Sequence, residues 1–266
     1  MAKTAIETRS TSTNGNTRPR QRQIVEMVGA RGFVPIDELA QHFGVTAQTI
    51  RSDVNRLCRE GALRRYHGGV GLFSTLDNAT FAKRQVLRHE QKVRIAAAVA
   101  AHVPDHASLF VHYGTTMQAV AEAFRKHRDL LLVTNNIGAI GAAQQIAGAR
   151  VILVGGDVTA NEQCTQGEAA TAFIKQFKVD FGILSVGSIG PDGTLYEFGY
   201  EVAQTARAIM AHSKQILLAV DSQKFDREGL VRVGHITEVS AVFTDRTPPA
   251  AVVRALRERK IPLHTA

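Results

Sequence analysis

The feature that most constrains this 266-residue chain is a pair of short amphipathic segments between residues 34 and 70, separated by a glycine. Leu39, Ala40 and Phe43 recur at helical spacing, so one face of the first segment is apolar and can be buried. Gly44 follows directly and is a typical helix stop. The pattern predicts a helix, a tight turn and a second helix.

The second segment has its own apolar stripe, formed by Ile50, Val54 and Leu57 at spacings of four and three residues. Thr46 precedes the segment and can cap it through its side-chain oxygen. The opposite face is polar and carries residue types that hydrogen-bond base edges and phosphates. The second helix of such a pair normally lies in the major groove of DNA. The candidate DNA contacts on it are Thr46, Gln48, Thr49, Arg51, Ser52 and Asn55.

One alternative and one exception qualify this interpretation. A polar outer face is also what any solvated amphipathic helix has. Asp53 lies on the same helix, but it is anionic and would be repelled by phosphates. We therefore expect Asp53 to orient Arg51 or Arg56 instead of contacting DNA.

A basic, strand-like segment follows the second helix. Arg64, Arg65 and His67 are candidates for phosphate contacts, and the paired glycines Gly68 and Gly69 allow a hairpin tip to approach a backbone closely. A solvated hairpin with incidental charge is the alternative. With the two helices, this segment predicts a winged helix-turn-helix.

The charge of the chain is concentrated at its N-terminal end. Residues 1–94 hold 16 Lys and Arg against 8 Asp and Glu, whereas residues 95–266 hold 16 against 16, so the formal net charge of +8 belongs to the first part. Such an excess favours a polyanionic partner. We expect operator DNA to be that partner, with Arg18, Arg20 and Arg22 adding phosphate contacts.

Targeting signals and cofactor motifs are not recognisable in the sequence. Cys58 and Cys164 are too few and too far apart for a disulfide framework or a metal cluster, which favours a reduced cytoplasmic setting without a cofactor. The polar N-terminus lacks the apolar core of a signal peptide. No stretch approaches 18 uninterrupted apolar residues, so no membrane span is expected.

The length suggests about two domains. We predict a disordered tail over residues 1–17, a winged helix-turn-helix over 18–72, a linker over 73–80 and a sensor domain over 81–266. The first helix of the DNA module is expected over residues 21–31, and one longer helix over residues 82–102.

Beyond the linker, short apolar runs alternate with helical segments. Near-continuous apolar strands separated by helices indicate a mostly parallel sheet that helices cover on both faces, and hence an α/β fold. The predicted strands are residues 108–111, 130–133, 150–154, 180–186, 215–220 and 241–244.

Small polar residues recur where these strands end. Ligands of open parallel sheets bind beyond the carboxyl ends of the strands, near helix N-termini whose free N–H groups favour anions. Each turn taken singly is equally compatible with ordinary helix caps, but the set predicts a site for a small phosphorylated effector. The candidate effector-binding residues are Gly114, Thr115, Thr116, Asn135, Gly155, Gly156, Gly187 and Lys224.

From about Arg20 to its C-terminus, the chain resembles the DeoR-type bacterial transcriptional regulators. The resemblance in the DNA module rests on Leu39, Ala40, Phe43, Gly44, Val45, Thr49, Ile50, Arg51, Asp53, Leu57, Leu63, Arg64, Arg65, His67, Gly68 and Gly69. In the sensor it rests on Gly114, Thr115, Thr116, Thr134, Asn135, Gly155, Gly156, Gly167, Glu168, Ala169, Asp180, Phe181, Gly182, Asp192, Gly193, Asp221, Lys224 and Phe225.

The resemblance implies a repressor that binds operator DNA as a dimer or tetramer and is released by a sugar phosphate. Residues 134–136, 173–184 and 195–200, with Pro248 and Pro249, are most similar to members that respond to glycerol-3-phosphate. Other members bind other sugar phosphates, and activation in place of repression stays open.

Three positions depart from the family pattern. Ser52 stands where a second arginine is usual, His112 where an acidic residue is common, and Gln223 where serine is commoner. These departures bear on one DNA contact and on which effector is recognised.

The family's sensor domain is related to phosphosugar isomerases and coenzyme A transferases, so an enzyme with vestigial DNA binding is the alternative. An aldose–ketose isomerase needs a carboxylate base and a cation. Asp221, Glu168, Glu197 and Lys224 nominally supply both. An attached DNA-reading module has no use in metabolic turnover, and we therefore expect no catalysis.

Overall fold

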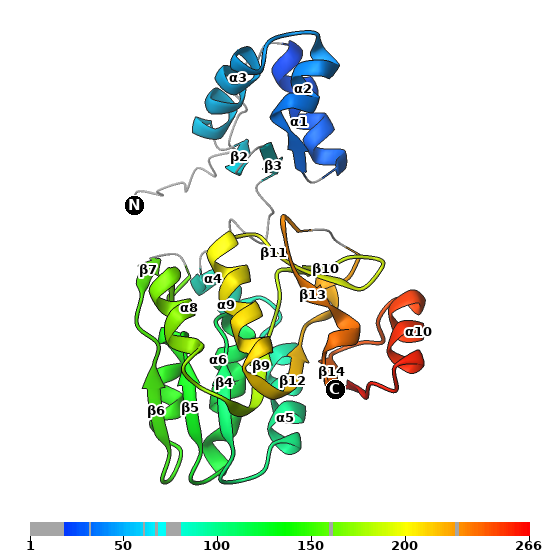
Figure 1. Cartoon of the computed structure of the whole chain (residues 1–266). Coiled ribbons are helices and arrows are strands. Elements are labelled where there is room, and N and C mark those ends of the chain that lie inside the picture. Colours follow the sequence, from blue (N-terminus) through cyan, green and yellow to red (C-terminus); the bar gives the residue numbers. More distant parts are fainter. Residues whose placement is uncertain are drawn as a thin grey trace, which may run out of the picture. The chain divides into compact units, whose positions relative to one another are not determined.

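The computed structural model describes residues 19–31, 33–60, 62–66, 69–72, 81–159, 162–226 and 229–266. The chain divides into two compact units, Met1–Ser74 and Thr75–Ala266 (Figure 1). Each unit has hydrophobic core clusters of its own. Within the residues described, no helix is both long enough and apolar enough to cross a membrane.

The first unit is a helix-turn-helix with a small antiparallel sheet. Its helices are α1 (Pro19–Arg31), α2 (Ile36–Phe43) and α3 (Ala47–Arg59), and its strands are β1 (Phe33–Pro35), β2 (Leu63–Tyr66) and β3 (Gly69–Leu72). The strands pair in the order β1-β3-β2. α1 begins at Pro19, two residues earlier than predicted. Proline is tolerated there because the N–H groups of the first helical turn have no acceptor within the helix, so the N–H that proline lacks is not needed. The predicted winged helix-turn-helix is confirmed.

The turn between α2 and α3 forms as its residues predict. Gly44 adopts the left-handed conformation with φ of 60°, and its N–H bonds back to the end of α2. Thr46 then accepts a hydrogen bond from the Thr49 N–H at 3.2 Å, capping α3. Leu39 and Ile50, one from each helix, are both fully buried in the shared core.

The second unit is built on a seven-stranded sheet in which every strand pairing is parallel. The strand order is β15-β14-β12-β9-β4-β5-β6. The strands are β4 (Ser108–Val111), β5 (Leu131–Thr134), β6 (Arg150–Leu153), β9 (Val179–Leu184), β12 (Ser213–Ala219), β14 (Ala241–Thr244) and β15 (Leu263–Thr265). The first six confirm the prediction. The sequence analysis missed β15, a three-residue edge strand with no continuous apolar run.

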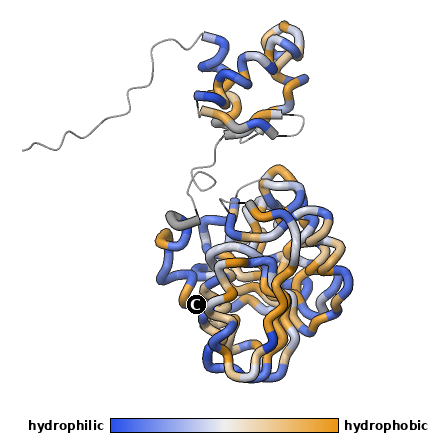
Figure 2. Tube along the Cα trace, turned by 90° about the vertical axis from the view of Figure 1, so that its left-hand side faces the viewer, coloured by the Kyte–Doolittle hydropathy of each residue, from blue (hydrophilic) through white to orange (hydrophobic). Residues whose placement is uncertain are grey.

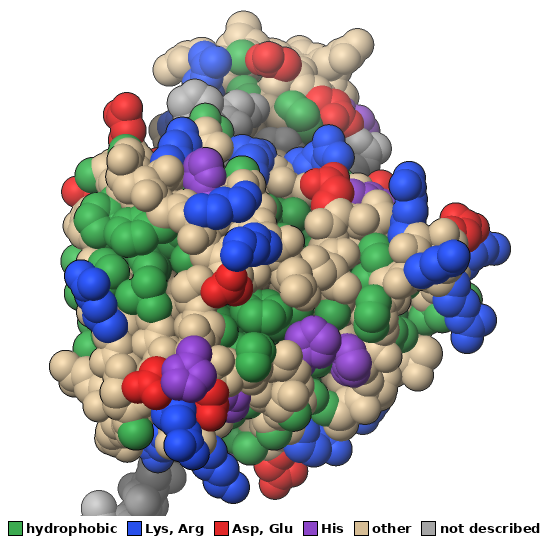
Figure 3. Space-filling model, turned by 60° about the horizontal axis from the view of Figure 1, so that its bottom comes forward, with side chains coloured by type: hydrophobic (Ala, Val, Ile, Leu, Met, Phe, Trp, Pro, Cys, Tyr) green, Lys and Arg blue, Asp and Glu red, His purple; other side chains and the backbone are tan. Residues whose placement is uncertain are grey.

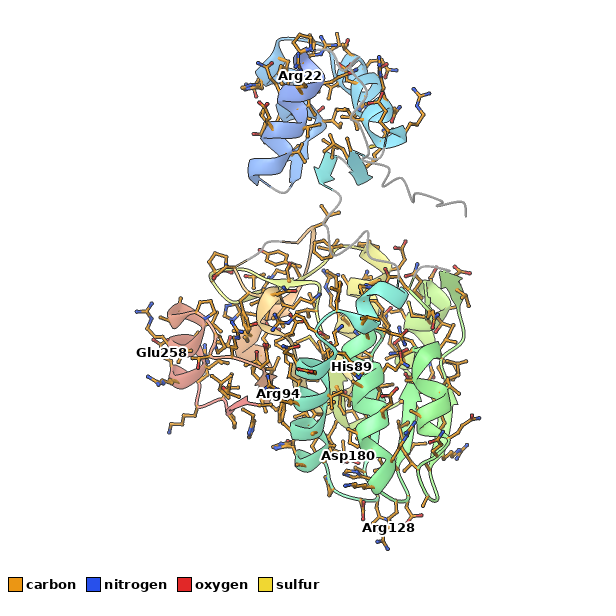
Figure 4. The ribbon with its side chains drawn as sticks, turned by 180° about the vertical axis from the view of Figure 1, so that it is seen from behind. Arg22, His89, Arg94, Arg128, Asp180 and Glu258 are labelled. Atoms are coloured by element: carbon orange, nitrogen blue, oxygen red, sulfur yellow. The ribbon has the colours of Figure 1, made fainter. Side chains whose placement is uncertain are left out.

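Helices cover both faces of this sheet, as expected for buried parallel strands. One core cluster joins one face of the sheet to α5 (His89–His102) and α6 (Thr115–Ala123), with Ala143 of α7 (Ile140–Ala143). The other joins the opposite face to α8 (Glu168–Ile174), α9 (Tyr200–Ala211) and α10 (Ala250–Glu258). Figure 1 shows α8 and α9 in front of the sheet, and Figure 4 shows α5 and α6 from behind. Hydrophobic segments concentrate in the strands between these layers (Figure 2).

Short elements complete the second unit. β7 (Asp157–Thr159) pairs with β8 (Cys164–Gln166), and β10 (Ser188–Ile189) and β13 (Val231–His235) flank β11 (Thr194–Glu197). Four single-turn 3-10 helices are present among the residues described: η1 (Phe124–Lys126), η2 (Ile137–Ala139), η3 (Ser222–Lys224) and η4 (Ile236–Glu238). The sequence analysis did not predict these short antiparallel strands or the 3-10 helices.

The expectation of one helix over residues 82–102 is wrong. The segment forms two helices, α4 (Phe81–Val86) and α5, because Arg88 adopts a left-handed conformation with φ of 55°. This conformation costs a non-glycine residue free energy, and the side chain of Arg88 compensates by bonding Ser222 and Asp245 at the edge of the sheet. The break is therefore set by distant residues.

Candidate functional site

The polar face of α3 is open to solvent. Gln48, Arg51, Ser52 and Asn55 are exposed, whereas Ile50, Val54 and Leu57 are buried on the opposite side. Thr46 and Thr49 share a hydroxyl hydrogen bond of 2.9 Å at the start of the helix. The predicted contact residues of this helix thus lie on one accessible surface.

Asp53 does not orient Arg51 or Arg56, so that expectation is wrong. The carboxylate is only 6% exposed and accepts hydrogen bonds from Arg20 Nε at 2.7 Å and Gln21 Nε2 at 2.8 Å. Arg56 instead pairs with Glu60 at 2.9 Å. Asp53 therefore joins α3 to α1. Arg20 is engaged in this ion pair but is still partly exposed, and its contact with phosphate stays a prediction.

The wing contacts the same helix. Arg65 of β2 is exposed and donates from Nη1 to Asn55 Oδ1 at 2.9 Å. The hairpin tip, with His67 and Gly68, lies outside the residues described, as does the side chain of Arg64. Arg22, at the opposite end of the module from the wing, is exposed on α1 (Figure 4).

In the second unit, the point where the strand order reverses lies between β4 and β9. Ligands of open α/β sheets bind at such a point, beyond the carboxyl ends of the strands. Gly114 follows β4 with φ of 109°, and no side chain caps the start of α6 after it. The first N–H groups of α6, at Thr115 and Thr116, therefore lack a side-chain cap within the described residues, as an anion site requires.

Lys224 and Gly187 come together at the neighbouring strand ends. Lys224 lies in η3 after β12, and its Nζ donates to the carbonyl of Gly187, which follows β9, at 3.2 Å. A Cβ on Gly187 would lie 2.9 Å from the ring of Phe198, so no larger residue fits without a shift. The structure thus places Thr115, Gly187 and Lys224 at the ends of three adjacent strands.

Several buried polar atoms at this edge of the sheet have no hydrogen-bond partner among the residues described. Native proteins leave few such atoms unsatisfied unless water or a ligand reaches them. Asn135 donates from Nδ2 to Thr165 O at 3.0 Å, but its side-chain oxygen is unsatisfied. These atoms include Asn135 Oδ1, Asn136 Oδ1, Ser188 Oγ and Thr244 Oγ1, each at or just beyond the carboxyl end of a strand.

Gly155 and Gly156 are not part of this arrangement. They follow β6, and three strands separate β6 from β12 in the sheet. Both residues are exposed, and a Cβ on Gly156 would lie 2.6 Å from the carbonyl of Gln166. The close approach of two backbone segments accounts for Gly156, and its assignment to the effector site stays a prediction.

Three cations that the sequence analysis missed lie at the same edge as Lys224. Arg88 donates from Nη2 to Ser222 Oγ at 3.0 Å and to Asp245, and its Nε lies 3.6 Å from Asp221 Oδ1. Arg84 pairs with Glu162 at 2.5 Å. Lys92, only 6% exposed, donates to the Arg84 carbonyl.

The boundary between the units also changes the account of the charge. Lys83, Arg84, Arg88, Lys92 and Arg94 fall within residues 1–94 but belong to the second unit. Only Asp77 and Glu90 oppose them there, so the second unit carries an excess of three positive charges of its own. A sequence count could have found this signal only with the domain boundary in hand.

Burial perturbs titratable groups near the strand ends. Desolvation lowers the pKa of Lys92 to about 8, although Asp221 opposes the shift. Desolvation also lowers the pKa of His112 to about 4. The Tyr113 hydroxyl donates to Glu197 at 3.2 Å, and burial with that carboxylate nearby holds the pKa of Tyr113 well above its usual value.

The amino-terminal edge of the sheet is different. Asp180 and Arg128 lie at this end (Figure 4), and Figure 3 shows charges of both signs interspersed on this side. Lys214 pairs with Asp180 at 2.8 Å, and Arg128 with Asp105 at 3.4 Å. Lys214 and Arg128 thus have carboxylate partners, whereas Lys92 and Lys224 at the other edge bond carbonyl groups.

The chain matches known proteins over nearly its whole length. It is 40% identical to the glycerol-3-phosphate regulon repressor of Escherichia coli (strain K12), over 92% of this chain and 97% of that protein. It is 36% identical to the HTH-type transcriptional repressor CsqR of the same organism, over 94% and 95% of the two chains. It is 30% identical to the transcriptional repressor AccR of Agrobacterium fabrum, over 92% and 96%.

Likeness to solved structures is weaker. eIF2B beta from Chaetomium thermophilum is 13% identical, covering 90% of this chain and 82% of that chain with a TM-score of 0.43. Ribose 5-phosphate isomerase from Plasmodium falciparum is 14% identical, covering 52% and 53% with a TM-score of 0.37.

Two domain families match in the order of the two structural units. The DeoR-like helix-turn-helix domain matches residues 20–75, and the DeoR C terminal sensor domain matches residues 87–246. Together with the identity to several transcriptional repressors along almost the full chain, these matches show that the protein belongs to the DeoR family of transcriptional regulators.

Proposed function

We propose that this protein is a repressor that binds operator DNA through α3 and the wing, and that a phosphorylated effector releases it. The observation that carries the proposal is the pairing, in one DeoR-family chain, of an exposed polar helix face with a cation-rich sheet edge. We assign residues 18–72 to the DNA module, 73–80 to the linker and 81–266 to the sensor.

On the DNA side, the proposed contacts are Thr46, Gln48, Thr49, Arg51, Ser52, Asn55, Arg64, Arg65 and His67. The side chains of Arg51 and Gln48 are exposed at the N-terminal part of α3, the part of a recognition helix that normally reaches the bases. Arg65, held beside the helix by Asn55, is suited to a phosphate.

One winged module covers only a short half-site. Useful affinity therefore requires that two or more modules act together on repeated half-sites. We propose a homodimer or homotetramer in a cytoplasmic setting, where operator DNA is accessible.

On the sensor side, we propose that the effector binds at the carboxyl ends of β4, β9 and β12, and that glycerol-3-phosphate is the favoured effector. The uncapped start of α6 at Thr115, the Lys224 ammonium and the unsatisfied Asn135 oxygen support a ligand with both a phosphate and hydroxyl groups. Glycerol-3-phosphate has both, and the Escherichia coli protein that is 40% identical is named the glycerol-3-phosphate regulon repressor.

An isomerase with vestigial DNA binding is less well supported. A carboxylate base must be free to accept a proton. Asp221 accepts a hydrogen bond from the Gln223 N–H at 3.0 Å and lies 3.6 Å from Arg88, and Asp245 also bonds Arg88. Both carboxylates are therefore engaged with Arg88 and are not directed at a substrate.

The effector can shift the equilibrium only by its differential affinity for the DNA-binding and released states. The coupling is reciprocal, so operator DNA should weaken effector binding by the same factor by which the effector weakens DNA binding. Calorimetry with glycerol-3-phosphate, glycerol and inorganic phosphate, combined with operator titrations, tests both statements.

Lys224→Ala is the decisive variant. It should weaken the binding of glycerol-3-phosphate by roughly 1.5–3 kcal/mol, the range for a hydrogen bond to a charged group. The affinity of the ligand-free protein for operator DNA should stay nearly unchanged. Lys126→Ala, an exposed lysine in η1 beyond the far end of α6, is the matched control. Equal affinities for glycerol and glycerol-3-phosphate would contradict the proposed anion site. Tight binding of another sugar phosphate would contradict only the choice of glycerol-3-phosphate as the effector.

A further inference from the structure

Lys92 is a buried cation whose neighbours do not neutralise it directly. Its side chain extends from α5, the residue is 6% exposed, and its Nζ donates to the backbone carbonyl of Arg84 near the end of α4. Among the residues described, no carboxylate forms an ion pair with it. Placing an ammonium group in such surroundings is costly unless an anion accompanies it.

Lys224 shares this property. It is partly buried, and its Nζ bonds the carbonyl of Gly187 at 3.2 Å without a carboxylate partner among the described residues. Lys92 lies one helical turn after Arg88, which donates to Ser222 Oγ at 3.0 Å in η3, the 3-10 helix that also holds Lys224, so both lysines lie at the same edge of the sheet. The charge of Lys224 also disfavours the charged form of Lys92. The nearby carboxylates of Asp221 and Asp245 are already occupied by Arg88. Asp221 favours the charged form of Lys92 from a distance, but the direct partners of both ammonium groups are backbone carbonyls, and neither forms an ion pair with a carboxylate among the described residues.

We infer that Lys92 and Lys224 together bind the phosphate group of the effector, with Lys92 as the buried anchor. The identification of that group as a phosphate monoester rests on the function proposed above. A phosphate monoester carries about two negative charges near neutral pH and offers three acceptor oxygens, which matches two ammonium groups and the open N–H groups of α6. A lone carboxylate would leave one of the lysines without a counter-charge.

The titration of Lys92 provides a readout that a merely structural lysine would not supply. The pKa of Lys92 is lowered to about 8 in the unliganded protein, mainly by burial. Asp221 opposes this shift, whereas the charges of Lys224 on η3, Arg84 on α4 and Arg88 at the start of α5 add to it. A bound dianion favours the charged form and must raise this pKa. Binding at about pH 8.5 should therefore take up a proton, because part of the Lys92 population is neutral before the ligand arrives.

The test is calorimetry on the full chain with glycerol-3-phosphate and with inorganic phosphate, in two buffers that differ in ionisation enthalpy. At about pH 7, Lys92→Gln should lower the affinity for both ligands about tenfold or more, as the loss of a hydrogen bond to a charged group does. Lys126→Gln should bind like the wild type. Lys92→Arg, which stays charged, should retain most of the affinity but lose the proton uptake at about pH 8.5.

Two results would overturn the inference: a folded Lys92→Gln protein with wild-type affinity, or wild-type binding at about pH 8.5 without proton uptake. If Lys92→Gln does not fold, the comparison of proton uptake between wild type and Lys92→Arg still decides. Phosphate binding that depends on Lys92 but does not release operator DNA would contradict the proposed function and leave this inference standing. Failure of the wild type to bind either probe would contradict both.

Discussion

Arg65 donates from Nη1 to the side-chain oxygen of Asn55 at 2.9 Å, which links the wing to the recognition helix. The bond occupies the acceptor of the Asn55 amide and leaves its N–H groups for DNA. It also fixes the guanidinium of Arg65 beside the helix, although Arg65 is ten residues further along the chain. The two parts of the proposed DNA surface are therefore coupled.

Arg51→Ala and Arg65→Ala should differ in kind. Arg51 lies on the exposed face of α3, so its loss should weaken operator binding by about 1–3 kcal/mol and reduce the discrimination between bases. Arg65 should act on phosphates, so its loss should weaken all sequences similarly and flatten the dependence of affinity on salt. Operator and scrambled DNA, each titrated across a range of salt concentrations, separate the two effects.

The control for this comparison is Asn55→Ala, which frees Arg65 without removing its charge. It should lower operator affinity but keep the wild-type salt slope. Wild-type binding by both arginine variants at every salt concentration would show that the interface lies elsewhere.

Asp53→Ala should destabilise the DNA module. Breaking a buried pair costs about 3–5 kcal/mol, and the partial exposure of Arg20 reduces this to about 2 kcal/mol. The change also leaves Gln21, which is 2% exposed, without this acceptor. Denaturant unfolding measures the decrease in the free energy of unfolding, and hydrogen exchange shows whether the decrease is located in α1 and α3. Stability equal to that of the wild type would mean that the contact between α1 and α3 is carried by apolar packing alone.

Arg88 and Asp245 should behave as a coupled pair. Arg88→Ala leaves two nearly buried carboxylates, Asp221 and Asp245, without their cation, so it should destabilise the sensor more than Asp245→Asn does. Adding Asp245→Asn to Arg88→Ala should partly restore stability. A double-mutant cycle by denaturant unfolding gives the interaction free energy, and strictly additive effects would contradict the pairing.

His112 should make the protein sensitive to acid. Its pKa is about 4 in the folded state, because burial disfavours the charged ring, against an ordinary value near 6.5. The unfolded state thus binds a proton that the folded state does not, and stability falls as the pH drops from about 6.5 towards 4, by up to about 3 kcal/mol.

His112→Asn should reduce this loss when unfolding free energies are measured at several pH values. A smaller slope should persist in that variant, since burial and His102 also lower the pKa of His264. Asp180 acts in a separate window: its pKa is lowered to about 2 by hydrogen bonds from Lys214 and Ser108, so its contribution is lost only below the ordinary range of an aspartate. An unchanged slope in His112→Asn would show that His112 does not titrate in this way.

Much of the fold could be predicted because it depends on short-range pattern. The helical spacing of Leu39 and Phe43, the stop at Gly44 and the cap at Thr46 act within a few residues of chain, so they determine α2, the turn and α3 before any distant contact forms. The apolar runs that form the first six strands of the large sheet are similarly local. These patterns also expose the polar face of α3, and with it most of the proposed DNA surface.

Only the tertiary structure decided which strand ends meet and which charges pair. Periodicity carries no information about strand order, so the sequence could not show that Gly156 follows an edge strand, three strands away from β12. Arg88 interrupts a helical pattern because Asp245, 157 residues away, binds its guanidinium, and Lys92 has its significance only because the fold brings it near Lys224. Electrostatic contacts depend on distance in space, which the linear order of residues does not specify.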